Sequence, residues 1–302
     1  MVAVSNISSM THTTLNKLVI IGVGLIGGSF ALALRNAGVA HHIVGVGRSP
    51  GNMQLALEKG VIDEIATDLS SALHHADFVL LAMPVGQNDP IMAQIAPHLQ
   101  PHTIVSDAGS TKQDVVTAAR RHLGDNLRNF VPGHPIAGAE LSGVLAAQAG
   151  LYIDKHVILT PLDITQINAI EKTAALWRAC GAKVSQMLIE EHDHILSATS
   201  HLPHVLAFAL MNHLRKSTNN PDNLLRFAGS GFRDFTRIAS SSPEMWRDIC
   251  LSNREELIKQ IKAYQSELSS IRLILETGKG AELEESFTQA RNMRNNWLKD
   301  TQ

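Results

Sequence analysis

Residues 17–28 read KLVIIGVGLIGG, and this stretch decides the fold of the first half of the chain. It starts as a continuous apolar run, which is typical of a strand buried on both faces of a sheet. The run passes into the pattern G-x-G-x-x-G at Gly22, Gly24 and Gly27, and a helical pattern follows over Leu25–Ala37. In this context the glycines predict a dinucleotide-binding turn, because they permit a tight turn, a close approach of the backbone to a pyrophosphate, and close helix–strand packing.

The start of the predicted helix supplies the binding groups of this turn. Its first N–H groups, at Leu25 and Ile26, have no partner within the helix, and the helix dipole adds partial positive charge there. Both features favour a bound phosphate group. A plain glycine-rich turn is the alternative, and the strand–turn–helix context favours the dinucleotide over it.

More apolar runs alternate with helical patterns up to residue 163, which predicts an α/β domain with a doubly wound, Rossmann-type parallel sheet over residues 1–163. The further expected strands are His42–Gly47, Asp77–Met83, Thr103–Asp107, Asn129–Pro132 and His156–Thr160. Residues 1–16 are rich in Ser, Thr and Asn and contain no Asp, Glu, Lys or Arg. We expect them to form a disordered tail rather than a secretion signal, which needs a basic start and an apolar run.

The second half of the chain changes to helical spacing, and we expect an all-α domain over residues 164–302 without further strands. Its predicted helices are Ile164–Cys180, Glu190–Lys216, Pro243–Glu276 and Ala281–Lys299, with a turn at Thr218–Asp222. The stretch Trp246–Leu275 has apolar residues on more than one face. From the residues alone, this pattern fits a buried domain core and a dimer interface equally well.

The overall composition is that of a soluble globular chain. Of its 302 residues 44% are apolar, and 26 basic against 28 acidic side chains leave a formal charge of −2. Without a basic run, this balance argues against nucleic acid or a membrane surface as partner, and no apolar stretch reaches the ~18 residues of a membrane span. Cys180 and Cys250 lie too far apart to predict a disulfide framework or a zinc motif, so we expect a cytoplasmic protein.

The end of the second predicted strand carries information about the cofactor. NAD-binding units place an Asp or Glu there, ~20 residues past the glycines, to hold the ribose 2′-hydroxyl. This chain has Arg48 and Ser49 instead, which favours NADP over NAD, because both side chains can bind a 2′-phosphate. Stacking of Arg48 on the adenine of either cofactor is the alternative. We also place Pro84, which follows the third strand, next to the cofactor.

Two polar motifs follow the last strands of the predicted sheet. Residues 107–112 read DAGSTK and residues 133–138 read GHPIAG. Because ligands bind at the carboxyl ends of such strands, we expect both motifs to face the nicotinamide. His134 is suited to act as a general base or to polarise a hydroxyl group, and Ser110 could orient it or hold the substrate. A purely structural loop histidine is the alternative.

Two segments of the helical half carry further candidate residues. Ser197, Ser200, His201 and His204 form a polar stripe at helical spacing, which needs hydrogen-bond partners if it is buried. A satisfied core network and a metal site are alternatives, but no third ligand accompanies the two histidines, so we expect no metal. Residues 229–237 read GSGFRDFTR, and a guanidinium of this segment would clamp a carboxylate. A surface loop with an internal Arg–Asp pair is the alternative.

Six motifs occur here in one order: the glycine turn, DAGSTK, GHPIAG, HDHILSATSHLPH at 192–204, GSGFRDFTRIA at 229–239, and PEMWRDI at 243–249. This ordered set resembles the prephenate/arogenate (cyclohexadienyl) dehydrogenase family and spans most of the chain. The resemblance implies NAD(P)+-dependent oxidative decarboxylation of prephenate to 4-hydroxyphenylpyruvate, or of arogenate to tyrosine. It also implies a homodimer formed by the C-terminal helices.

The resemblance assigns roles to individual residues. His134 matches the family's catalytic histidine, and Ser110 matches its serine partner. The matching substrate-side residues are Ser200, His201, His204, Asp234, Arg237 and Trp246. Two other functions remain as alternatives: a two-domain dehydrogenase of a small hydroxy acid, and a non-catalytic NADP-sensing module. The second would lack a proton-transferring group at the nicotinamide, and His134 argues against it.

Overall fold

The computed structural model describes residues 13–138, 143–217 and 224–300. Most of the predicted tail and the predicted turn at Thr218–Asp222 therefore lie outside the described residues. The chain divides into two compact units, residues 1–253 and residues 254–302. The first unit contains every residue of the site described below.

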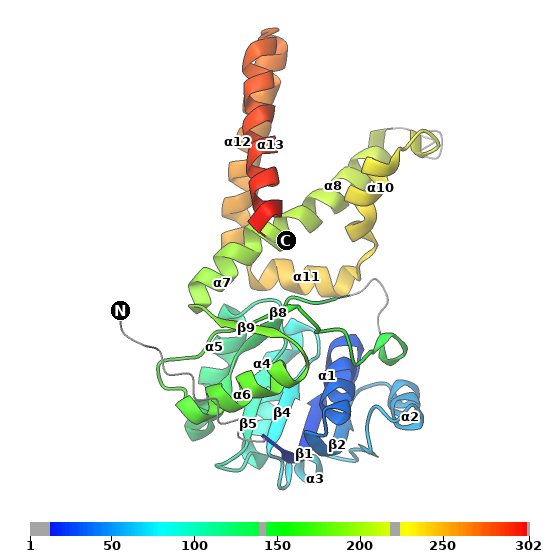
Figure 1. Cartoon of the computed structure of the whole chain (residues 1–302), viewed down its shortest axis with the longest axis vertical. Helices are drawn as coiled ribbons and strands as arrows, with labels where there is room; N and C mark the ends of the chain where they lie inside the picture. The colour runs from blue at the N-terminus through cyan, green and yellow to red at the C-terminus, as the bar shows by residue number, and fades with distance from the viewer. Residues whose placement is uncertain (1–12, 139–142, 218–223, 301–302) are drawn as a thin grey trace. The chain divides into compact units, whose positions relative to one another are not determined.

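A six-stranded parallel sheet forms the centre of the first unit (Figure 1). A parallel sheet was predicted here, but its strand at Glu64–Ile65 was not. Its strand order is β3-β2-β1-β4-β5-β6. The bounds are β1 Leu15–Ile21, β2 Ala40–Val46, β3 Glu64–Ile65, β4 Phe78–Leu81, β5 Ile104–Asp107 and β6 Phe130–Val131. The order reverses direction between β1 and β4, and this switch point is where ligands bind in doubly wound sheets.

Helices cover both faces of this sheet because its strands are apolar on both sides. The helices of this part are α1 Leu25–Asn36, α2 Pro50–Glu58, α3 Leu69–Leu73, α4 Asn88–Ile95, α5 Gln113–His122 and α6 Ile167–Ala179. One core contains residues of α1, α2 and α6, and the other contains residues of α3, α4 and α5. Short 3-10 turns join these elements: η1 Val85–Gln87, η2 Ala96–His98, η3 Gly124–Asn129 and η4 Val144–Ala146.

The start of the chain differs from the prediction. Leu15 and Asn16, which we assigned to the tail, belong to β1. Leu15 is fully buried and pairs with Ala40 of β2. A single buried leucine in a polar stretch is too weak a pattern to extend a strand from sequence alone.

A second, three-stranded sheet consists of β7 Gly133–Pro135, β8 His156–Leu159 and β9 Lys183–Gln186. β8, which we expected in the parallel sheet, pairs antiparallel with β7 and parallel with β9. The expectation of no strands after residue 163 was therefore wrong. β9 is short, polar and mostly exposed, so no apolar pattern marks it in the sequence. The boundary predicted at 163/164 lies before α6. Helix α6 packs in the same core as α1, since its buried Trp177 has its ring 4.5 Å from that of Phe30.

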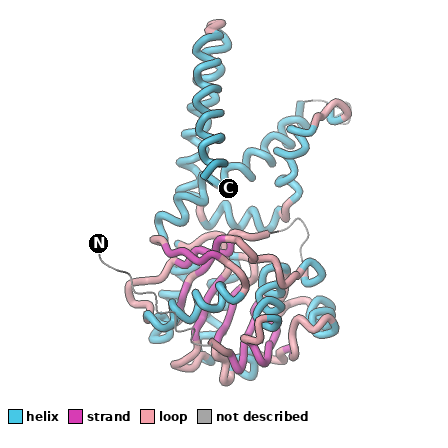
Figure 2. The backbone as a smooth tube through the Cα atoms, viewed as in Figure 1, coloured by secondary structure: helices cyan, strands magenta, loops and turns pink. Residues whose placement is uncertain are grey.

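The helical part of the first unit begins after β9. Its elements are α7 Ile189–Leu196, a π-helical turn at Ser197–His201, α8 Leu202–Ser217, α10 Ser230–Thr236, η6 Arg237–Ser240 and α11 Pro243–Ser252. The π turn precedes Pro203, whose missing N–H removes one helical hydrogen bond. α11 packs against η1 through Trp246, Ile249 and Val85, which places the helical part over the sheet part (Figure 2).

The second unit consists of two helices, α12 Arg254–Glu276 and α13 Gly280–Asp300. The long helix expected over Trp246–Leu275 is interrupted, because α11 ends at Ser252 and the next residue, Asn253, has a φ of −107° and a ψ of 33°, which are not helical. Many large apolar side chains of this unit are exposed in the single chain, among them Leu268, Leu273, Phe287 and Trp297. No helix in the described part of the chain is long and apolar enough to cross a membrane.

Candidate active site

The glycine turn between β1 and α1 has the geometry of a phosphate-binding turn. Gly22 has a φ of +101°, and a Cβ there would lie 2.7 Å from the carbonyl carbon of Ala82. A Cβ on Gly27 would lie 2.3 Å from the oxygen of Gly22. At Gly24, by contrast, a Cβ would meet nothing within 4 Å, so this glycine leaves open space. The first and third glycines are thus required by packing, whereas the space at the second leaves the backbone open to a ligand.

The N-terminus of α1 is open to an anion. Its N-cap residue is Gly24, which has no side chain to cap the helix. The first N–H groups, including those of the predicted contacts Leu25 and Ile26, are therefore available for a pyrophosphate. Pro84 directly follows the neighbouring Ala82–Met83 backbone at the end of β4. These residues fit a dinucleotide at the switch point of the sheet.

Arg48 and Ser49 lie at the carboxyl end of β2, as predicted. Both are exposed, and no acidic residue occurs between Val46 and Asn52. Ser49 caps α2, since its Oγ accepts a hydrogen bond from the Asn52 N–H at 3.4 Å. Its hydroxyl hydrogen is not used in that bond and can be donated to another group.

A buried ion pair supports the two motifs at the ends of β5 and β6. Lys112 Nζ pairs with Asp107 Oδ2, and both side chains are fully buried. Lys112 also donates to the carbonyl of Gly133 at 2.7 Å, and Asp107 accepts from the N–H groups of Gly109 and Gly133 at 2.8 and 3.1 Å. These bonds join the loop that carries Ser110 to the strand that carries His134.

His134 lies on β7 and is 9% exposed. Its Nδ1 is 2.9 Å from Nε2 of His192, and His192 Nδ1 is 2.8 Å from Asp193 Oδ1. Burial, the neighbouring His192 and the charge of Lys112 hold the pKa of His134 well below its ordinary value. The imidazole is therefore neutral at pH 7 and able to accept a proton.

His192 and Asp193 were not among the predicted site residues, although both lie inside the motif HDHILSATSHLPH. A signal for their burial is present: His192 and Asp193 precede Leu196 by four and three residues, so all three share one face of α7. Leu196 is buried on that face. Besides each other, their partners are His134 and the backbone of Lys112 and Gln113, which come from distant segments that spacing does not reveal.

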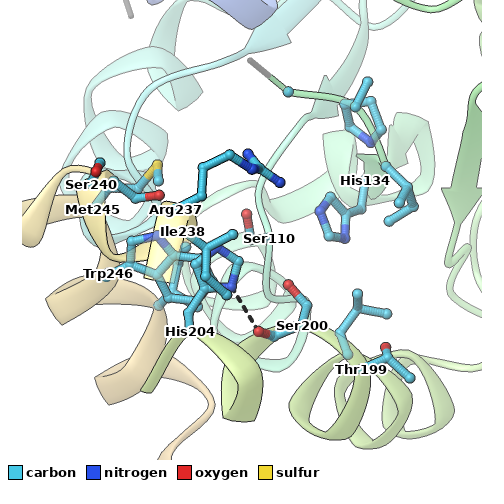
Figure 3. Close-up of a pocket in the computed structure, with 17 residues that line it drawn as sticks. Ser110, His134, Thr199, Ser200, His204, Arg237, Ile238, Ser240, Met245 and Trp246 are labelled. Atoms are coloured by element: carbon cyan, nitrogen blue, oxygen red, sulfur yellow. Dashed lines mark hydrogen bonds between the residues drawn. The ribbon is translucent and has the colours of Figure 1, made fainter. Parts of the chain in front are cut away.

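A cavity of about 700 Å³ opens next to His134 (Figure 3). Its polar lining combines both halves of the unit: Ser110, His134, Ser200, His204 and Arg237. Trp246, Ile249 and Met245 supply apolar lining from α11. Together with Trp246, six of the predicted site residues thus line one cavity. The cavity has room for a small diacid.

His204 and Trp246 form one wall of the cavity. Their rings stack with centroids 3.7 Å apart and an angle of 20° between the planes. His204 Nδ1 donates to the carbonyl of Ser200 at 2.9 Å, so in the neutral ring Nε2 is an acceptor. Burial lowers the pKa of His204. The hydrogen bond to Ser200 raises this pKa and the charge of Arg237 lowers it, and the net shift is downward.

Two predicted substrate residues lie elsewhere. His201 is 1% exposed and sits behind the cavity wall, with Nδ1 3.2 Å from Nδ2 of Asn253 and its ring edge-on to Trp246 at 6.1 Å. Asp234 is exposed and lines an adjoining hollow together with Arg233. Of the predicted polar stripe, Ser200 and His204 line the cavity, because residues four apart share one face of a helix, and His201 does not. Among the described residues, no group of three or more His, Cys, Asp or Glu side chains could hold a metal.

The fold and the site together define a class of protein. A doubly wound sheet with an open glycine turn, and a neutral buried histidine in a cavity beside the sheet, are the parts of a nicotinamide-dependent dehydrogenase.

Comparison with known proteins identifies the particular family. The family models for the prephenate dehydrogenase nucleotide-binding domain and dimerization domain match residues 30–186 and 189–289. A prephenate dehydrogenase of Bacillus subtilis is 37% identical over 92% of this chain and 75% of its own length. A cyclohexadienyl dehydrogenase of Zymomonas mobilis is 35% identical over 93% of this chain and 96% of its own.

A solved structure agrees with these sequence matches. The prephenate dehydrogenase of Aquifex aeolicus, crystallised with hydroxyphenyl propionate and NAD+, superposes with a TM-score of 0.87 at 37% identity. The match covers 93% of this chain and 98% of the other. The chain belongs to the prephenate dehydrogenase family.

Proposed function

We propose that this protein catalyses the NAD(P)+-dependent oxidative decarboxylation of prephenate to 4-hydroxyphenylpyruvate, of arogenate to tyrosine, or of both. The observation that carries the proposal is that His134 and Arg237, from the sheet part and the helical part, line one cavity. An imidazole for the ring hydroxyl and a guanidinium for a carboxylate are the two groups that this substrate requires. Family membership supports the same reaction.

His134 acts on the hydroxyl group of the cyclohexadiene ring. The hydroxyl proton moves to His134 as the C–H bond of the same carbon breaks. The electron pair of the ring C–CO₂ bond then enters the ring, which becomes aromatic as CO₂ leaves, and the phenolate oxygen takes the proton back from His134. The bound nicotinamide supplies a two-electron acceptor for the hydride. General base catalysis of this kind contributes ~10²–10⁴-fold to the rate. Ser110, on the cavity wall beside His134, holds the hydroxyl in place.

The helical part holds the rest of the substrate. Arg237 is exposed in the single chain and offers its guanidinium to a carboxylate from the cavity rim. Ser200 and His204 contribute polar contacts, and the indole of Trp246 provides an apolar surface for the ring. His201 supports this wall from behind without facing the substrate, and Asp234 is a neighbour of Arg237 at the rim.

The glycine turn binds the pyrophosphate through Gly22, Gly24, Leu25, Ile26 and Gly27. NADP is the preferred cofactor, because exposed Arg48 and Ser49 replace the carboxylate that would repel a 2′-phosphate.

We further propose a cytoplasmic homodimer. The exposed apolar side chains of α12 and α13 support the dimer, since such a surface is normally covered by a partner. The dimerization-domain match includes both helices up to residue 289.

Steady-state kinetics with prephenate and arogenate, each with NAD+ and NADP+, test the proposal. We expect release of CO₂ and formation of 4-hydroxyphenylpyruvate or tyrosine. Turnover of small hydroxy acids in place of both substrates would support the general dehydrogenase alternative. Binding of NADP+ without any turnover would support the sensing module.

A further inference from the structure

Two buried side chains outside the cavity, His192 and Asp193, continue the hydrogen bonding of His134 into the protein. In this series of hydrogen bonds, Nδ1 of His134 lies 2.9 Å from Nε2 of His192, and Nδ1 of His192 lies 2.8 Å from Oδ1 of Asp193. His192 is 0% exposed and Asp193 is 1% exposed. Burial of a carboxylate raises the free energy of the folded state unless its oxygens accept hydrogen bonds.

The carboxyl group of Asp193 is ionised. Its Oδ1 and Oδ2 accept from the backbone N–H groups of Lys112 and Gln113, each at 2.9 Å, at the N-terminus of α5. Burial raises the pKa of Asp193, but the hydrogen bonds from His192 and from this backbone outweigh burial and hold the pKa below its ordinary value. The helix dipole of α5 favours the same charge.

An ionised carboxylate only accepts hydrogen bonds. This fact determines which group donates in each hydrogen bond from Asp193 through His192 to His134. His192 Nδ1 must donate to Asp193, so the neutral His192 ring has its lone pair on Nε2. His134 Nδ1 must then donate to His192 Nε2. Burial keeps the pKa of both imidazoles below the ordinary value, so both rings are neutral at pH 7. The remaining lone pair of His134 is therefore on Nε2.

The same direction suits the proposed chemistry. Nδ1 of His134 is turned toward His192, and among the described residues none forms a hydrogen bond with Nε2. A proton acceptor for a substrate in the cavity needs its lone pair on the nitrogen that the interior does not use. When Nε2 gains a proton, the new positive charge lies one imidazole away from the Asp193 carboxylate.

We propose that His192 and Asp193 are positioning residues, which hold His134 in the tautomer whose Nε2 can accept the substrate proton and which stabilise the imidazolium that results. The proposal rests on the proposed function of His134 as proton acceptor. In the step itself, the substrate O–H bond breaks and the His134 Nε2–H bond forms, while the hydrogens on Nδ1 of both histidines stay in place. No proton passes to Asp193.

The tautomer is measured directly by NMR of the full-length protein, labelled with ¹⁵N in its histidine rings, at pH 8 without substrate. Loss of signals in the His134→Asn variant assigns His134. We expect a protonated Nδ1 and an unprotonated Nε2. An Nε2-protonated His134 would overturn the proposal. Because no turnover is involved, the expected tautomer in a protein that oxidises neither substrate would refute the proposed function and leave this assignment supported.

Two variants of His192 separate positioning from packing. In His192→Gln, the amide can donate to Asp193 and accept from His134, as the imidazole does, whereas His192→Phe fills the space and can do neither. We expect the Phe variant to lower kcat on the order of 10²-fold with little change in KM, and the Gln variant to retain ~10-fold more activity. Equal kcat values in the two variants would contradict the proposal.

A matched control uses His213, an exposed histidine of α8. His213→Phe should leave kcat and KM unchanged. Circular dichroism checks that each variant is folded. If His192→Phe does not fold, the NMR measurement on the unchanged protein still decides the question.

Discussion

The imidazole of His204 lies flat on the indole of Trp246, with ring centroids 3.7 Å apart. The indole itself is 7% exposed and packs with Val85 and Ile249, where the helical part contacts η1 of the sheet part. One side chain therefore forms the cavity wall and also joins the two parts of the first unit. A change at this position should affect both stability and substrate binding.

The first prediction follows from this double role. Trp246→Ala should lower the free energy of unfolding by ~3–5 kcal/mol, because it removes a large buried ring and leaves a space that neighbours only partly fill. Urea unfolding monitored by circular dichroism measures this loss. Phe227→Ala is the control, since Phe227 is 82% exposed and its removal should cost less than ~0.5 kcal/mol. Equal losses in the two variants would argue against the packing role of Trp246.

His134→Asn tests the proton acceptor. We expect kcat to fall by ~10² or more while KM changes little, because the lost interaction strengthens in the transition state. His156→Asn, which alters an exposed histidine on the adjacent strand β8, should have no such effect. Full activity of His134→Asn would remove this residue from the mechanism.

Arg237→Gln tests the carboxylate clamp. Since the guanidinium binds a part of the substrate that does not react, its loss should raise KM more than it lowers kcat. Arg247→Gln on α11 is the matched control, because the Arg247 side chain is exposed and lies outside the cavity lining. An unchanged KM in Arg237→Gln would mean that another group holds the carboxylate.

Arg48→Asp tests the cofactor preference. The carboxylate would repel a 2′-phosphate and accept hydrogen bonds from a ribose 2′-hydroxyl, so the ratio of kcat/KM for NADP+ to that for NAD+ should fall. The measurement is kcat/KM for both cofactors in both proteins. The same ratio before and after the change would refute the role given to Arg48.

The buried histidines predict a loss of stability in acid. Burial lowers the pKa of His201 to about 4, so between its ordinary value and pH 4 the unfolded chain binds a proton that the folded chain does not. The free energy of unfolding should therefore decrease as the pH falls through this range, and the lowered pKa values of His134 and His192 act in the same direction. Urea unfolding at a series of pH values tests this expectation. A flat profile between pH 7 and pH 4 would contradict it.

Local pattern was enough to predict several features of this protein. The run from Lys17 to Gly28 predicts a strand, a turn and a helix from neighbouring residues alone, and the structure confirms all three. Apolar periodicity likewise predicts the parallel sheet and the helical second half. Of the residues that line the cavity, Ser110 and His134 were candidates because they follow strand ends, and Ser200 and His204 because of their helical spacing. Trp246 was a candidate only through the resemblance to the family.

Only the tertiary structure decided which of those groups meet. β8 pairs with β7 and β9 rather than joining the parallel sheet, and this choice depends on strands that are too short or too polar to recognise locally. Asp193 finds its donors at the start of α5, 80 residues earlier in the sequence. Sequence patterns report which residues share a face of one helix or strand. Contacts between distant segments depend on how whole elements pack, and the hydrogen placement on His134 follows from those contacts.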